Sequence, residues 1–110
     1  MTYQEIFEML QSSELPVTYY QWNEDDDIPS LPYLVFYFPT SDNFGADNRV
    51  YKNIENLNVE LYTKNKDFAT EKQVETLLEE NGFFWEKQES FIESENMYEV
   101  LYQMQVAINE

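Results

Sequence analysis

The chain has 110 residues, 43% of them hydrophobic, and a net charge of −16 that arises from 22 Asp and Glu residues against six Lys and Arg residues. This balance argues against a surface for nucleic acids or anionic membranes, because both bind through clustered Lys and Arg. The absence of Cys and His excludes disulfides, Ser–His and Cys–His nucleophile pairs, and zinc sites with nitrogen or sulfur ligands.

Length and aromatic content predict one folded domain over residues 1–110. An aromatic content of 17% is well above that of a disordered acidic tail. The sequence begins Met-Thr-Tyr-Gln-Glu-Ile, without the basic and apolar regions of a signal peptide. No apolar run approaches the roughly 20 residues needed to span a bilayer. We therefore expect no membrane partner and a location in the cytoplasm of the producing cell.

The first part of the chain predicts a short helix followed by a strand. Thr2 and Glu5 have the spacing of a capping box, in which each side chain accepts a hydrogen bond from the backbone N–H of the other residue. The next apolar residues have the spacing of one helix face and are Ile6, Met9 and Leu10. We expect this helix to end near Ser12–Ser13. After Pro16, residues 17–22 are rich in β-branched and aromatic side chains and predict a strand.

The middle of the chain predicts two loops and two strands. Residues 23–32 combine four consecutive acidic residues with two prolines and indicate an exposed loop. Residues 33–38 are apolar or aromatic throughout and predict a central strand covered on both faces. Residues 40–48 contain Gly45 and several Asp and Asn, which indicates a second loop, and the chain becomes strand-like from Arg49. One face of this strand is predicted to be buried by alternate residues, namely Leu57, Val59, Leu61 and Thr63.

A second helix is predicted between Asp67, a suitable N-cap, and Gly82, a suitable residue to close the helix at its C-terminus. Its apolar stripe contains Val74, Leu77 and Leu78, which Phe68 can join from the first turn. Charged residues are expected mainly outside this stripe, and they are Glu71, Lys72, Glu75, Glu79 and Glu80.

The last part of the chain predicts an antiparallel hairpin. One strand is expected from Phe83 to about Ile92, followed by a turn over residues 93–96. The final strand is apolar at every even position, namely Tyr98, Val100, Tyr102, Met104, Val106 and Ile108. The complete order predicts an α+β fold, with a mostly antiparallel or mixed sheet of four to five strands and two helices packed on one face.

The acidic loops are the first places to consider a metal, because hard cations prefer clustered oxygen ligands. Asp25 and Asp27 match two positions of a calcium-binding EF-hand loop, but Ser30 and Phe36 occupy the positions that require Gly and Glu. The Asp and Asn residues of the second loop are also typical of loops that hydrogen-bond their own backbone. We therefore predict no metal site and no cofactor.

The sequence does not select a catalytic site. Paired carboxylates can perform acid–base chemistry, as in glycosidases, but no spacing among the 22 acidic residues selects a pair. We predict no enzymatic activity and no catalytic residue.

Aromatic and charged residues favour protein contacts instead. A stacking platform for single-stranded nucleic acid needs a positive groove, which six basic residues can hardly provide. Most aromatic residues are expected in the core, whereas Tyr62 lies on a polar strand face and suits a protein interface. The few basic residues can either pair with the acidic side of a neighbouring subunit or only relieve local repulsion. The predicted interface residues are Glu24, Asp25, Asp26, Asp27, Phe44, Asp47, Arg49, Tyr62 and Lys64.

A series of short segments between Leu31 and Tyr102 resembles one protein family. The segments are Leu31-Pro32-Tyr33, Ala46-Asp47-Asn48 with Val50-Tyr51, Val59-Glu60-Leu61-Tyr62-Thr63, and Glu93-Ser94-Glu95 with Tyr98, Val100 and Tyr102. Their order and spacing resemble a family of small proteins encoded in Gram-positive tailed phages and prophages. That family is placed among the head–tail connection and tail-completion, or tail terminator, proteins.

The resemblance implies a small α+β protein that forms a hexameric ring on the last ring of the tail tube, stops tube polymerisation and joins the tube to the filled head. Its implied partners are further copies of itself, the major tail tube protein and the head-completion protein, without a cofactor. It would act in the host cytoplasm during assembly and then lie at the head–tail junction of the virion. A negative lumen would repel the DNA backbone, so that the genome passes through without specific binding. The loops at residues 24–27 and 40–48 are expected to make assembly contacts or to line this channel.

Two alternatives stay open at this point. A head-completion adaptor of the same connector would differ in location more than in chemistry. An acidic DNA mimic, which inhibits a host DNA-binding protein, fits the net charge but needs carboxylates on one continuous face at phosphate spacing. The acidic residues of this sequence are instead spread over predicted loops, helices and strands.

Overall fold

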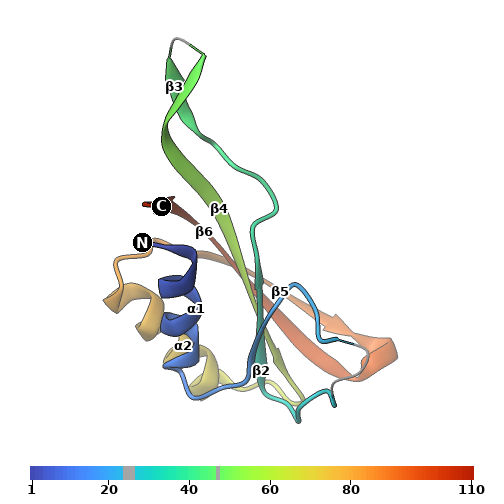
Figure 1. The fold of residues 1–110 in the computed structure, drawn as a ribbon. Helices are drawn as coiled ribbons and strands as arrows, with labels where there is room; N and C mark the ends of the chain where they lie inside the picture. Colours follow the sequence, from blue (N-terminus) through green and yellow to red (C-terminus); the bar gives the residue numbers. More distant parts are fainter. Residues whose placement is uncertain (24–26, 47) are drawn as a thin grey trace.

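The computed structural model describes residues 1–23, 27–46 and 48–110, which form a layer of two helices on one face of a β-sheet (Figure 1). In chain order the elements are α1 (Tyr3–Gln11), β1 (Val17–Tyr19), β2 (Tyr33–Tyr37), β3 (Phe44–Ala46), β4 (Arg49–Thr63), α2 (Phe68–Glu80), β5 (Glu86–Ile92), a 3-10 turn (Glu93–Glu95) and β6 (Met97–Ile108). The strand order is β1-β2-β4-β6-β5, with β3 paired only to β4. The β1–β2 pair is parallel and the other pairs are antiparallel. Among the described residues, no helix is long and apolar enough to cross a membrane.

The predicted α+β fold and C-terminal hairpin are confirmed. The core lies between the helices and the inner face of the sheet, which we define as the face that the helices cover. Strands β2, β4 and β6 contribute every second residue to it, namely Leu34, Phe36, Leu57, Val59, Leu61, Val100, Tyr102, Met104, Val106 and Ile108. Helix α1 adds Ile6, Met9 and Leu10, the face predicted from their spacing. Each large apolar side chain buried in this way contributes about 1.5–3 kcal/mol.

Both helices begin at the predicted caps. The Glu5 backbone N–H donates to Thr2 Oγ1 at 3.1 Å, and the Thr2 N–H donates to Glu5 Oε1 at 2.8 Å, which completes the capping box. Asp67 Oδ1 accepts a hydrogen bond from the Thr70 N–H at 3.0 Å. These side chains satisfy backbone donors that have no partner within the helix.

The end of α2 explains why the next strand starts later than predicted. Gly82 has a φ of +82°, a conformation that costs little without a Cβ. The backbone N–H of Phe83 then donates to the Leu78 carbonyl at 3.0 Å, as in a Schellman motif. Phe83 is therefore buried in the core beside the helix end, whereas Phe84 is 85% exposed. The strand predicted from Phe83 begins only at Glu86.

Two other predicted boundaries are wrong. The strand expected over residues 17–22 ends at Tyr19, because Tyr20 has a φ of +68° and leaves the extended conformation. Residues 40–48 do not form a loop throughout, since Phe44–Ala46 pair with β4 as strand β3. The turn between these two strands contains Asn48, which has a φ of +62°, and Asn tolerates this left-handed region better than most residues.

The buried face of α2 also differs from its prediction. Val74 and Leu78 are fully buried, as expected, but Glu71 and Glu75 are also buried, with exposures of 3% and 8%. The four residues have the i, i+3, i+4, i+7 spacing of a single helix face. Phe68 does not join this face and is 73% exposed. The prediction that both glutamates lie outside the stripe is therefore wrong.

Glu75 is buried because strands β5 and β6 supply its partners. Lys87 Nζ lies 2.8 Å from Glu75 Oε2, and the fully buried Tyr102 hydroxyl donates to the same oxygen at 2.8 Å. The hydrogen bond to Glu75 raises the pKa of Lys87. Burial, reinforced by Glu75, raises the pKa of Tyr102. The carboxylate thus joins α2 to both strands of the C-terminal hairpin.

Glu71 is held by two lysines. Lys66 Nζ lies 2.6 Å and Lys87 Nζ 3.5 Å from its carboxylate oxygens. Lys66 also pairs with Glu89 on β5. Lys87 and Glu89 reach the helix because both lie on the inner face, opposite Tyr102 and Val100 of β6.

Replacing Glu75 with Gln is expected to lower the free energy of unfolding. The amide still accepts a hydrogen bond from Tyr102 but loses the charge that pairs with Lys87. We expect a loss of about 1–2 kcal/mol, below the range for a fully buried pair because the Lys87 side chain is 41% exposed. Urea unfolding measures this difference.

Glu79→Gln is the matched control, because it removes the same charge from an exposed position of the same helix. We expect the control to change stability by less than about 0.5 kcal/mol. Equal stabilities for the two variants would contradict a stabilising role for the buried ion pairs.

Candidate functional site

The most distinctive surface feature is a β-hairpin that extends beyond the body of the sheet (Figure 1). This hairpin, which we call the arm, consists of β3 and the first residues of β4, with Phe44 opposite Lys52 and Ala46 opposite Arg49. Strand β6 begins to pair with β4 only at Asn53. Within the described part of the chain, the first residues of β4 therefore pair with β3 alone. The arm exposes Arg49, Lys52 and 67% of Phe44.

Polar side chains fix the foot of the arm to the sheet. Asp42 Oδ2 accepts hydrogen bonds from Asn56 Nδ2 and Gln105 Nε2, both at 3.0 Å. Asn43 Oδ1 accepts one from the backbone N–H of Ile54 at 3.0 Å. The side-chain oxygens of Asp42 and Asn43, two residues of the predicted oxygen-rich loop, therefore bind neighbouring strands. Within residues 1–23, 27–46 and 48–110, no cluster of three or more acidic side chains is placed to hold a metal ion.

The predicted interface residues do not form one patch. Arg49 and Tyr62 lie near opposite ends of the 15-residue strand β4, which spans roughly 45 Å at about 3.3 Å per residue. Phe44 lies with Arg49 on the arm, and Lys64 follows Tyr62 at the far end, where it is exposed. Asp27 is exposed. The other predicted interface residues lie outside the described residues, and they are Glu24, Asp25, Asp26 and Asp47.

Tyr62 belongs to a cluster on the outer face of the sheet, on which no helix lies in the described part of the chain. Its hydroxyl lies 3.1 Å from both Glu60 Oε1 and Glu99 Oε2. Its ring centroid is 5.4 Å from that of Tyr33 on the neighbouring strand. Tyr62 is half-buried in this cluster, so its hydroxyl already has partners within the same chain.

Glu60 and Glu99, which we call the carboxylate pair, come together through the register of β4 and β6. Glu99 lies directly opposite Tyr62, and Glu60 is two residues along the same face. A tyrosine hydroxyl donates only one hydrogen bond. It can therefore hydrogen-bond to both carboxyl groups only when one of them is protonated and donates a hydrogen bond to the hydroxyl oxygen. Burial, reinforced by the charge of Glu99, raises the pKa of Glu60. The Tyr62 hydroxyl thus lies between two carboxyl groups, and Glu60 binds its proton more tightly than a free Glu does.

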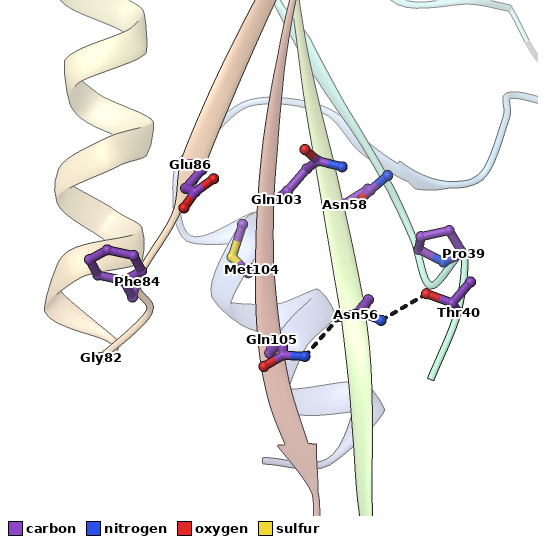
Figure 2. A pocket seen from close by; sticks show the side chains of 10 residues that line it. All are labelled: Pro39, Thr40, Asn56, Asn58, Gly82, Phe84, Glu86, Gln103, Met104 and Gln105. Atoms are coloured by element: carbon purple, nitrogen blue, oxygen red, sulfur yellow. Dashed lines mark hydrogen bonds between the residues drawn. The ribbon is translucent and has the colours of Figure 1, made fainter. Parts of the chain in front are cut away.

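A trough on the outer face is the second feature that the sequence did not predict (Figure 2). Its volume is about 580 Å³, and its lining residues are Pro39, Thr40, Asn56, Asn58, Gly82, Phe84, Glu86, Gln103, Met104 and Gln105. Figure 2 shows four carboxamides from β4 and β6 between Pro39 and Thr40 on one side and Phe84 and Glu86 on the other.

The trough combines polar and apolar groups. Three of its four carboxamides already donate hydrogen bonds within the chain, since Asn56 and Gln105 donate to Asp42 and Asn58 donates to the Tyr37 hydroxyl. Gln103 and the exposed ring of Phe84 add a further polar group and an apolar contact. Neither member of the carboxylate pair lines the trough. The alternation of Asn and Gln on β4 and β6 was visible in the sequence, but only the strand register brings these residues into one surface.

Comparison with known proteins does not assign the chain to a family. No protein-family model matches it, and no curated protein matches it either. Its functional interpretation therefore depends on the arm, the outer face and the distribution of charge.

Replacing Glu60 with Gln tests the carboxylate pair through its pH dependence. Because folding raises the pKa of Glu60, the folded state binds this proton more tightly than the unfolded state does. The stabilisation is present below the usual Glu pKa and is lost as the pH rises through the raised pKa. We expect Glu60→Gln to be more stable than the parent at neutral pH by about 0.5–1 kcal/mol, the scale of a like-charged cross-strand pair. Urea unfolding should show this difference shrinking towards about pH 4.

The control is Glu86→Gln, which removes the same charge from an exposed position of β5 on the outer face. A smaller effect at neutral pH is expected for this variant. The same stability gain in both variants would show that the effect is general relief of repulsion and would rule out the proposed role of the pair.

Proposed function

We propose that this chain is a structural protein of a tailed phage or prophage, a tail terminator that assembles as a ring on the tail tube and joins the tube to the head. The observation that carries this proposal is the arm. One of the two strands of the arm is the first part of β4, and the other end of β4 lies in the core. The arm therefore extends from the body as a defined projection. Such a projection suits a subunit that makes contact with a neighbouring subunit in a ring.

The charge of the chain supports the same proposal. Lys66 and Lys87 are already paired with glutamates of α2 and β5. The net charge of the whole chain is −16, so negative charge dominates the molecule. A ring of such subunits would present a negative lumen to DNA. Repulsion of the phosphate backbone would let the genome pass without binding.

Assembly explains the candidate surfaces better than catalysis does. The trough is lined by carboxamides and apolar groups, and the carboxylate pair is bound by a tyrosine hydroxyl outside it. We propose that the partners are other copies of the chain, the major tail tube protein and the head-completion protein. The protein would act in the host cytoplasm during assembly and remain at the head–tail junction of the virion.

Deletion of the gene from its phage or prophage, followed by electron microscopy of the particles, tests this function. A terminator stops tube polymerisation, so we expect full heads without tails beside abnormally long tail tubes. Full heads beside tails of normal length would indicate a head-completion adaptor instead. Normal infectious particles would contradict an assembly role and favour the DNA mimic.

A further inference from the structure

The arm has an exposed surface that the described residues of its own chain do not cover. A two-stranded hairpin is at best marginally stable in water without a further packing surface. In this arm the Phe44 side chain is 67% exposed, so its ring is an apolar contact available to a partner. Arg49 and Lys52 place two of the six basic residues of the chain on the same region, where both are exposed.

A concave apolar surface lies near the foot of the arm on the helix-bearing side of the molecule. This surface, which we call the aromatic groove, has a volume of about 570 Å³ and is lined by Tyr3, Gln4, Phe7, Tyr19, Phe36, Phe38 and Glu55. Edge-to-face contacts at 5.2 Å join Tyr3 to Phe38 and Tyr19 to Phe36. Tyr3 and Tyr19 are 37% and 51% exposed, so the groove can accept another aromatic side chain.

The arm does not fill the groove of its own chain. The register places Phe44 opposite Lys52, roughly 10 Å along β4 from Glu55 at the near edge of the groove. Tyr19, at the far side, is aligned through Phe36 with Val59, more than about 20 Å along β4 from Lys52. The Phe44 ring and the groove are thus both available to a second molecule.

The charges favour a second copy of this chain as that molecule. Glu55 lines the groove, and the exposed Glu8 lies beside it, within 3.4 Å of the Gln4 side chain. Arg49 and Lys52 of an incoming arm would meet these carboxylates, whereas two acidic bodies would otherwise repel each other. The strongest contacts of an interface are often aromatic side chains and Arg in well-packed pockets.

We propose that the arm of one copy binds the aromatic groove of the next, with Phe44 as the anchor. The two surfaces differ, so the contact is heterologous and each copy both donates an arm and accepts one. Repetition of this contact with rotational closure produces a ring. The inference depends on the proposed ring-forming function and specifies the contact that builds the ring.

Sedimentation velocity of complementary variants tests the contact. Phe44→Ser removes the anchor, and the uncharged change Gln4→Trp fills the groove from an exposed position of α1. We expect the parent protein to self-associate as its concentration rises and each variant to lose at least about tenfold in association constant. An equimolar mixture should form a dimer and nothing larger, because only one intact arm and one intact groove remain.

Phe68→Ser is the matched control, since this Phe is 73% exposed at the start of α2 and lines neither the groove nor the trough. It should associate like the parent. Tyr19→Ser provides a second groove variant if Gln4→Trp disturbs α1. A parent protein that stays monomeric at millimolar concentration, or a mixture that forms no dimer, would overturn the proposal. Neither of these outcomes would change the particle phenotype of the gene deletion. The proposed contact can therefore fail while the proposed function stands.

Discussion

The structure depends most on the continuity of strand β4. Its C-terminal part pairs with β2 and β6 and buries Leu57, Val59 and Leu61 beneath the helices. Its N-terminal part leaves the sheet and forms the arm with β3. Because both parts belong to one strand, the hydrogen bonds of the sheet and the side chains at the foot determine the direction of the arm. The fold thus presents an extended element without a separate linker, within a molecule whose longest dimension is 50 Å.

A second constraint is the net charge of −16, which opposes compaction through self-repulsion. Lys66 and Lys87 reduce this repulsion between α2 and the sheet, where buried negative charge is most unfavourable. Each of these lysines contacts two carboxylates. Arg49 and Lys52 lie instead on the arm, away from these carboxylates. Four of the six cations therefore lie in two places, with Lys66 and Lys87 neutralising carboxylates in the body and Arg49 and Lys52 on the arm, where we propose that they meet an acidic neighbour.

Features with a local cause were predictable from the sequence, including the helix caps, the period of two in the last strand and the fold class. Features that depend on strand register were not. Glu75 is buried because β5 brings Lys87 beneath α2, and the helix sequence alone contains no sign of that partner. Glu60 and Glu99 meet only through the pairing of β4 with β6. Residues 40–48 predict a loop because Gly, Asp and Asn are common in loops, although the same residues form hairpin turns when a strand such as β4 is available for pairing.

A cryo-electron microscopy reconstruction of the head–tail junction, made from virions of the phage or prophage that we propose encodes this chain, tests the account most directly. The account predicts a ring of copies on the last ring of the tail tube, with Phe44 of each copy bound in the aromatic groove of its neighbour. Density for the junction that contains no copy of this chain would contradict the account.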